Sequence, residues 1–476
     1  MSVARVEGSS AFSDAALRVA ARLDPGNGLP AGRDLILVVE SDAGPPPSTW
    51  ADRQALILAA VLSARARTDA LDEGLELIQR FFVGRRLIRP AALGDGARSV
   101  LLSSAAEYCG AAGWPQVGVG FATGALLFAD IPARRFRALS VLAQNLAMNG
   151  EYAAATVAID QAREVFGEEG WDAAETDHWL LFGEGMIAAG HARIARVHEI
   201  ADELERARPD DPSWLFTAEM LRATACFVSR DHATGLARCR TLLLGSRRSH
   251  RLVRERVLGL QSGILALQGD LDEALAVIEG CTTQPGHAVC FTAYRASILL
   301  DLGRDRELID ETNVCVALGD GHCLAPLPAI LVRRAIAFAR LDAPQRALAS
   351  MEATLMLIER TGGSVVPFLA VPRDESVRLL QSVATRRCDL RPQIDALIAV
   401  LPPATASTGG RAGIAALTPA ELALTELLTA GLSLAQIARV RSVTLSTVKS
   451  QVRSIYAKLG VSTRQGAVAL LQRSPG

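Results

Sequence analysis

Apolar residues follow a helical period along most of the chain. Between about Trp50 and Leu401 the sequence divides into apolar-periodic segments of about 12–18 residues that end at small or polar residues. Successive breaks are roughly 34–45 residues apart and fall at Thr68, Gly113, Gly150, Gly190, Arg230, Gly269, Gly303 and Asp342. This spacing is typical of helix pairs that are too small to bury their own apolar faces and therefore stack into a solenoid.

Two segments show the unit most clearly. In residues 136–166 one helix face carries Leu139, Leu142, Ala143 and Leu146, a turn follows at Gly150 and Tyr152, and the returning helix carries Ala155, Ile159 and Ala162. The same turn chemistry recurs in residues 269–275. Both units resemble tetratricopeptide repeats, although several units lack the aromatic and glycine landmarks. The sequence therefore predicts a degenerate repeat or a plain α-solenoid over residues 51–401.

The two segments outside this pattern are less regular. In residues 1–50 the sequence predicts a short helix over Ala15–Leu23, a Pro/Gly-rich passage, and a strand over Leu35–Glu40, and we assign this segment no function. Residues 402–416 are rich in Pro, Gly, Ser, Thr and Ala, a composition that cannot pack a core. We expect a flexible linker there.

The composition is that of a globular protein, with 50% hydrophobic and 21% charged residues. No signal peptide and no apolar stretch long enough to span a bilayer is evident, so we expect a cytoplasmic protein with no membrane partner. The eight cysteines include no C-x-x-C pair, which favours reduced thiols.

Charge is distributed unevenly. The net charge is −1, but residues 417–476 contain seven basic and two acidic residues, so this segment carries +5 and the first 416 residues carry −6. Only two of the 50 basic residues are lysines, Lys449 and Lys458, and both lie in this segment. A basic terminal domain on an acidic body indicates a nucleic-acid partner.

Local signals in residues 417–476 predict four short helices. Thr418 and Glu421 form a capping box around Pro419 for the first, and Ser433 and Gln436 form a second box. Thr444 is placed to cap a third helix that ends before Gly460, and a fourth begins at Ser462 or Thr463.

The third helix has two different sides. Val448, Val452, Ile455 and Leu459 form one apolar stripe, while the opposite side presents Ser446, Lys449, Ser450, Arg453 and Lys458. No acidic residue occurs from Leu445 to Leu459. Such a helix fits a groove lined by phosphates.

The segment resembles the LuxR-type helix-turn-helix domain, over about an eighth of the chain. The resemblance is carried by Leu417-Thr418-Pro419-x-Glu421, Gly431-Leu432-Ser433, Ile437-Ala438, Thr447-Val448-Lys449, Lys458-Leu459-Gly460-Val461, Arg464 and Ala467-Val468. It implies that the third helix enters the DNA major groove and that the fourth supports dimerisation.

By position, the resemblance implies a set of DNA-contacting residues. Lys449, Ser450 and Arg453 would read base edges, and the phosphate contacts would come from Ser433, Ser446, Thr447 and Lys458. Gln451 joins this set at a position where histidine is common. Three departures weaken the match: Leu434 and Ala435 replace usual polar residues, and Gly466 lies early in the fourth helix, where it costs about 0.5–1 kcal/mol relative to Ala.

The order of repeat body, linker and terminal domain also resembles the C-terminal part of the large MalT-like regulators. Those proteins carry a nucleotide-binding module, but this chain has no G-x-x-x-x-G-K-[ST] motif. We therefore expect no nucleotide switch of that kind and no cofactor.

Other candidate motifs favour packing over chemistry. Gly118–Gly124 lacks the last glycine of a dinucleotide loop, and His198 with Glu199 lacks the second histidine of a zinc protease. The spacing of Cys281, His287, Cys290, Cys315, His322 and Cys323 matches no standard zinc site. We expect no catalytic residue, no metal site and no enzymatic activity, and leave open whether the cysteine cluster senses a redox or metal signal.

The sequence thus predicts an all-α protein, an α-solenoid followed by a linker and a four-helix LuxR-type domain at 417–476. We expect a transcription regulator that binds double-stranded DNA as a homodimer or higher oligomer, with RNA polymerase as a candidate partner. The repeat body would sense a protein, peptide or small-molecule effector. Two alternatives stay open: a sigma-like promoter-recognition factor, and a scaffold whose basic domain binds an acidic partner.

Overall fold

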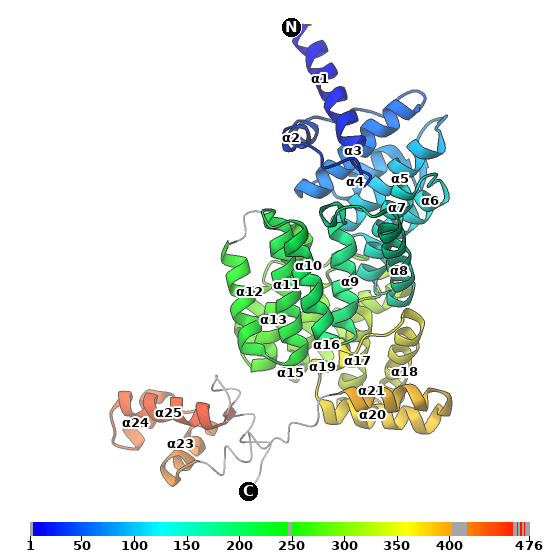
Figure 1. Cartoon of the computed structure of the whole chain (residues 1–476). Helices are drawn as coiled ribbons and strands as arrows, with labels where there is room; N and C mark the ends of the chain where they lie inside the picture. The colour runs from blue at the N-terminus through cyan, green and yellow to red at the C-terminus, as the bar shows by residue number, and fades with distance from the viewer. Residues whose placement is uncertain are drawn as a thin grey trace.

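The computed structural model describes residues 3–245, 250–401 and 417–459, together with positions 464, 467, 468 and 471. Within these residues the protein is helical apart from one short antiparallel hairpin, β1 (Phe82–Val83) and β2 (Arg86–Leu87), and an isolated bridge between Trp50 and Ala91. The predicted all-α class is confirmed (Figure 1). The predicted linker, residues 402–416, lies outside the described residues.

Helix pairs fill the middle of the chain. The first helices of the pairs are α3 (Asp52–Thr68), α5 (Asp95–Ala111), α7 (Pro132–Asn149), α9 (His178–Gly190), α11 (Pro212–Ser229), α13 (Arg251–Gln268), α15 (Phe291–Asp301) and α17 (Leu327–Arg340). The second helices are α4 (Leu75–Phe81), α6 (Pro115–Leu127), α8 (Tyr152–Glu169), α10 (Ile194–Ala207), α12 (His232–Gly245), α14 (Leu271–Val277), α16 (Asp305–Leu318) and α18 (Pro344–Thr361).

Further elements flank these pairs. The chain begins with α1 (Val3–Ala20) and α2 (Gly32–Glu40), and the body ends with α19 (Val366–Leu369), α20 (Arg373–Arg386) and α21 (Arg391–Val400). Three 3₁₀ turns lie at η1 (Ala173–Glu175), η2 (Gly319–Gly321) and η3 (Cys388–Leu390). The C-terminal helices are α23 (Pro419–Thr429), α24 (Leu434–Val440) and α25 (Leu445–Leu459).

Each predicted break coincides with the end of a first helix. The backbone takes a positive φ at or within two residues of every break, at Asp69, Gly113, Gly150, Ala192, Arg230, Gly269, Gly303 and Asp342. The unit predicted at 136–166 is also present, since Leu139, Ala143 and Leu146 of α7 share a buried core with Ala155 and Ile159 of α8. The hydrophobic period therefore located the helix pairs correctly.

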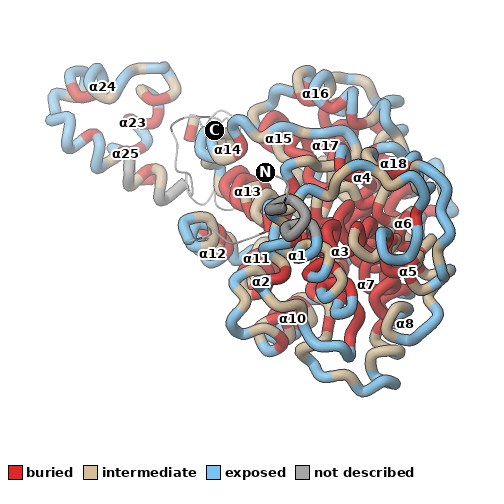
Figure 2. The backbone as a smooth tube through the Cα atoms, turned by 90° about the horizontal axis from the view of Figure 1, so that it is seen from above, coloured by how far each residue is buried: buried red, intermediate tan, exposed pale blue. Residues whose placement is uncertain are grey.

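The stacked pairs turn back on themselves. Ala288 N donates a hydrogen bond to Gly113 O (2.8 Å), and Gln116 Nε2 donates to the carbonyls of Asp320 (2.7 Å) and His322 (2.9 Å). The region around Gly113 and Gln116 therefore contacts two loops that lie far away in the sequence. In the view of Figure 2, buried residues concentrate along α3, α5, α7 and α13.

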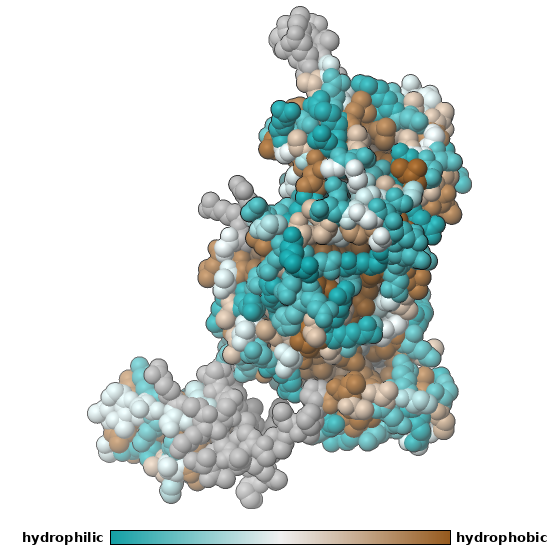
Figure 3. Space-filling view, viewed as in Figure 1, coloured by the Kyte–Doolittle hydropathy of each residue, from teal (hydrophilic) through white to brown (hydrophobic). Residues whose placement is uncertain are grey.

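One outer face of the body, over α10 and α11, is polar. Figure 3 shows hydrophilic residues gathered over α10 and α11. On this face the Arg222 guanidinium pairs with Asp202 (2.7 Å) and Glu219 (2.8 Å). Arg222 is only 14% exposed, whereas its two carboxylate partners are more open to solvent, so these pairs lie at the edge of a solvated surface.

The strand predicted at Leu35–Glu40 is wrong, because these residues lie in helix α2. Asp34 and Val38, four residues apart, are buried on one side of α2, and the Arg18 Nη2 of α1 lies 2.8 Å from Asp34 Oδ1. Tertiary packing with a helical period outweighs the strand propensity of the Leu-Ile-Leu-Val-Val run. Helix α1 is also longer at its N-terminal end than the predicted Ala15–Leu23.

None of the described helices combines the length and the apolar character that crossing a bilayer requires.

Candidate nucleic-acid interface and cavities of the repeat body

The predicted helix caps of the C-terminal domain are present. Thr418 and Glu421 form a reciprocal capping box at α23, and Ser433 and Gln436 form one at α24. Thr444 Oγ1 accepts a hydrogen bond from the Thr447 amide (3.1 Å) at the start of α25. Each cap satisfies backbone N–H groups that would otherwise lack a partner, so the boundaries of the three helices are set locally.

The three helices enclose a core of their own. Val448, Val452 and Ile455 of α25 are buried and share this core with Leu424 of α23 and Ile437 of α24. The predicted apolar stripe is confirmed at these three positions. The side chain of the fourth, Leu459, lies outside the described residues.

A tight turn connects α24 to α25. Ser442 has a φ of 53°, and the Val443 amide donates to the Ala438 carbonyl (3.0 Å). This left-handed residue ends the seven-residue α24 and redirects the chain. The arrangement is a helix-turn-helix, and it leaves the side of α25 opposite the core open to solvent.

The open side of α25 carries hydroxyl groups and a cation. Ser446, Thr447, Lys449 and Ser450 are all exposed, and the Thr444 hydroxyl bonds the hydroxyls of Ser446 (2.7 Å) and Thr447 (2.8 Å). Within the part of the chain that the structure describes, Lys449 forms no ion pair. The side chains of Arg453 and Lys458 lie outside the described residues, although both positions belong to α25.

Two further contacts of α25 were not anticipated from the sequence. Gln451 is half-buried, and its Oε1 accepts from Arg441 Nη1 (3.2 Å), which ties α25 to the end of α24. The Ser454 hydroxyl donates to Glu421 Oε1 (2.8 Å), so the capping residue of α23 also fixes α25. No sequence motif signals either pair, because both join residues of different helices.

The predicted fourth helix falls mostly outside the described residues. Positions 464, 467, 468 and 471 are helical, Ala467 is fully buried, and Arg464 Nη2 donates to the Leu428 carbonyl (2.9 Å). Its predicted start at Ser462 or Thr463 and its Gly466 are among the residues that are not described.

Comparison with protein families assigns this domain. Residues 415–471 match the family described as "GerE: Bacterial regulatory proteins, luxR family". The C-terminal domain is a LuxR-family domain. This assignment supports a DNA-binding transcription regulator.

Comparison with curated proteins gives no match. Among solved structures, the chain is similar to a "Rap Protein Complexed with Competence and Sporulation Factor". The TM-score is 0.50 at 10% identity, over 75% of this chain and 99% of the other. At this identity the likeness concerns the fold alone, and it supports a helical-repeat body in front of the LuxR domain.

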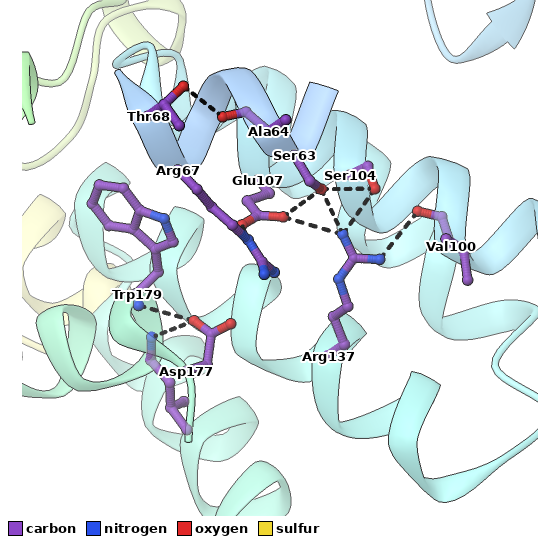
Figure 4. Close-up of polar contacts among 11 residues, drawn as sticks. Ser63, Ala64, Arg67, Thr68, Val100, Ser104, Glu107, Arg137, Asp177 and Trp179 are labelled. Carbon is purple, nitrogen blue, oxygen red and sulfur yellow. Dashed lines mark hydrogen bonds and ion pairs between the residues drawn. The ribbon is translucent and has the colours of Figure 1, made fainter. Parts of the chain in front are cut away.

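One polar cavity lies at the N-terminal end of the body. It measures about 250 Å³, and its lining includes Arg67, Glu107, Asp177, His178 and Arg208. Figure 4 shows Arg67 and Arg137 on either side of Glu107, with Asp177 at the start of α9. Burial alone would raise the pKa of Glu107, but the two guanidinium groups and the Ser63 hydroxyl outweigh it and hold this pKa below its usual range. The charge of Glu107 in this cavity is therefore compensated by Arg67 and Arg137.

A second cavity of about 220 Å³ lies among the first helices α9, α11, α13, α15 and α17. Its lining is mainly apolar and includes Met186, Met220, Phe227 and Tyr294. Arg333 also lines it and is only 6% exposed. Burial lowers the pKa of Arg333 to about 10.

The buried guanidinium of Arg333 is bonded only to neutral groups. It donates to the Ala329 carbonyl (2.8 Å), the Ser297 hydroxyl (3.2 Å) and the Ala370 carbonyl (3.4 Å), and it forms no ion pair within the described part of the chain. Its Nε also lacks a partner, so Arg333 places a positive charge without an ion pair at this mainly apolar cavity, and Arg256 is a second arginine of the lining.

The remaining sequence candidates have clear places in the fold. Gly118–Gly124 lies within α6, where Gly118 faces Asn145 of α7. His198 is exposed on α10. Of the cysteine cluster, the structure brings together Cys290, Cys315 and His322, which the spacing in the sequence did not single out.

Proposed function

We propose that the protein is a sequence-specific DNA-binding transcription regulator whose repeat body senses an effector. The observation that carries this proposal is α25, a helix with a buried apolar side and an exposed side of hydroxyls and a cation, within a LuxR-family domain. A helix of this kind fits the width of the major groove.

The proposed roles follow from position on α25. Lys449, Ser450 and Arg453 reach base edges, while Ser446, Thr447, Lys458 and the α24 residue Ser433 contact phosphates. Gln451 Oε1 accepts a hydrogen bond from Arg441. We therefore propose that Gln451 orients Arg441 and that it lies at the edge of the interface with DNA. Two domains of a dimer would bind half-sites about one helical turn apart.

The body is the sensor in this proposal. The effector is a protein, peptide or small molecule. It binds at the cavity among the first helices α9, α11, α13, α15 and α17, where Arg333 favours a group with negative charge. The similar solved structure holds a Rap protein in complex with competence and sporulation factor, which supports a body of this fold as a binding unit. Effector binding changes self-association and so raises the local concentration of the tethered DNA-binding domains.

A selection experiment tests the proposal. The full chain is offered random DNA duplexes, and the retained sequences are read and then bound at several salt concentrations. We expect enrichment of a two-fold symmetric site and an affinity that falls steeply with salt. Retention without any enriched sequence would instead favour the scaffold interpretation, and binding only in the presence of core polymerase would favour a sigma-like factor.

A further inference from the structure

Three buried side chains with metal-binding atoms meet in the body. Cys290 precedes α15, Cys315 lies in α16, and His322 follows η2. One ligand atom from each lies within 4.8 Å of those of the other two. The residues are 2%, 4% and 2% exposed, so the three groups face one another rather than solvent.

The separation of the two sulfurs suits a shared metal ion. Cys290 Sγ lies 3.9 Å from Cys315 Sγ. With zinc–sulfur bonds of about 2.3 Å and tetrahedral angles, two thiolates on one zinc ion are about 3.8 Å apart. The ion could therefore enter between the sulfurs with almost no movement of α15 relative to α16.

The histidine is held in the tautomer that a metal ion requires. His322 Nδ1 lies 2.7 Å from the Cys323 carbonyl oxygen. Because a carbonyl oxygen can only accept, Nδ1 must carry the proton, and the lone pair of the ring is on Nε2. Metal-ligating histidines are oriented by this kind of hydrogen bond from the second ring nitrogen to a backbone carbonyl.

The surroundings isolate the cluster but leave a route to it. Cys290 and Cys315 share a small apolar core with Ala293 and Ile330, in which thiolates are poorly solvated without a cation. Cys290 also borders the 220 Å³ cavity among the first helices, which gives an ion a path of entry.

We propose that Cys290, Cys315 and His322 form a binding site for one thiophilic d¹⁰ metal ion, Zn²⁺ or Cu⁺. The two thiolates and Nε2 of His322 are the protein ligands, and a fourth position stays available to an exogenous ligand. Soft sulfur ligands combined with imidazole select these ions over Mg²⁺ or Ca²⁺. The site is independent of the proposed DNA contacts, since it lies wholly within the repeat body.

An ion at this site would act on the junction between repeat turns. His322 lies in the loop whose Asp320 and His322 carbonyls accept from Gln116, and whose Cys323 Sγ donates to the Met148 carbonyl (3.3 Å). Binding would fix this loop to α15 and α16. The metal would therefore stiffen the contact between the first and later turns of the solenoid.

Metal titration of the full chain tests the site. Reduced, metal-free protein is titrated with Co²⁺ as a spectroscopic probe for zinc, then with Zn²⁺ in competition with a chromophoric chelator. We expect one equivalent to bind, with intense thiolate-to-cobalt absorption that zinc abolishes. A parallel titration with Cu⁺ and a copper(I) chelator measures the affinity for Cu⁺ at the same site, where we again expect one equivalent to bind.

Variants link binding to these three residues. Cys290→Ser, Cys315→Ser and His322→Ala should each weaken zinc or copper binding at least about 100-fold, whereas Cys239→Ser, at a buried cysteine of α12, should not. Circular dichroism of the metal-free variants shows whether they fold, and Cys315→Ala serves as a second variant if serine is not tolerated. Added metal should also raise the melting temperature of the wild type but not of the site variants.

Three outcomes would overturn the proposal: a wild type that binds neither ion, folded site variants that bind metal as tightly as the wild type, or a Cys290–Cys315 disulfide whose reduction restores no metal binding.

Discussion

The Glu107 carboxylate and the Arg137 guanidinium form an ion pair of 3.1 Å with both side chains only 2% exposed. Glu107 lies on α5 and Arg137 on α7, and Arg67 of α3 bonds the other carboxylate oxygen (2.7 Å). One buried carboxylate therefore connects three successive first helices, as Figure 4 shows.

Removing this carboxylate should be costly. In Glu107→Ala two guanidinium groups lose their partner inside the body, and we expect a loss of about 3–5 kcal/mol in the free energy of unfolding. Glu199→Ala is the matched control, because Glu199 is 62% exposed in its pair with Arg196 and should cost less than about 1 kcal/mol. Urea unfolding followed by circular dichroism measures both, and equal losses would contradict the assigned role of Glu107.

Acid should destabilise the body through two buried histidines. Burial lowers the pKa of His250 to about 4, and burial together with the charge of His250 lowers the pKa of His178. In the unfolded chain both histidines bind protons near pH 6.5, whereas native His250 binds its proton only near pH 4 and the pKa of native His178 is also lowered, so stability is lost as the pH falls below about 6.5.

The variant His250→Gln should show a shallower loss between pH 6.5 and pH 4 than the wild type. The neighbouring Asp69, whose pKa burial raises to about 6, titrates with the opposite sign and is present in both proteins. The difference between the two unfolding curves therefore reports His250 together with the effect of its charge on His178. If the stability of the wild type and of His250→Gln changed equally with pH, the pKa of His250 would be the same in the folded and the unfolded chain, and the prediction would be wrong.

The contact between repeat turns can be tested at a glycine. Gly150 has a φ of 89°, and a Cβ there would lie 2.7 Å from the backbone N and Cα of Ala325. Gly269 has a similar φ of 86° but nothing within 4 Å of its Cβ position. Both alanine variants are strained by the positive φ, but Gly150→Ala must also push the two turns apart.

We therefore expect Gly150→Ala to lower the free energy of unfolding by about 1–3 kcal/mol more than Gly269→Ala. Thermal or urea unfolding measures the difference. If both variants lost the same free energy of unfolding, the loop at Ala325 would move aside without cost, and the contact between Gly150 and Ala325 would not stabilise the body.

The DNA-binding domain should fold without the body. Its core, formed by α23, α24 and α25, is separate from the clusters of the body, and each helix carries its own cap. A fragment from Gly410 to the C-terminus should show a helical circular dichroism spectrum and bind DNA more weakly than the full chain, since it lacks the assembly surface. A fragment that stays unfolded even with DNA would place the domain boundary elsewhere.

The sequence predicted local features well. Helix breaks, caps and the stripe at Val448, Val452 and Ile455 depend on residues a few positions apart, and the structure confirms them. The run Leu35–Glu40 was misjudged because its conformation depends on α1 and α3, which the local pattern does not contain.

Contacts between distant repeats could not be predicted. Even within one part of the body, Cys290 before α15, Cys315 in α16 and His322 after η2 are brought together by helix packing, so their spacing reflects helix lengths rather than a compact metal-binding loop. The pairing of Gln116 with Asp320 likewise follows from how far the solenoid turns, which the repeat period alone does not fix.

The most direct test of the account is the affinity of Lys449→Ala for the duplex selected by the wild type, with Arg378→Ala, an exposed arginine of α20, as the control of equal charge. If α25 reads the major groove, Lys449→Ala loses about 1–3 kcal/mol of binding free energy on this site and discriminates less between bases, while Arg378→Ala binds as the wild type does. Arg453→Ala should behave like Lys449→Ala. Unchanged cognate affinity in both α25 variants would contradict the account.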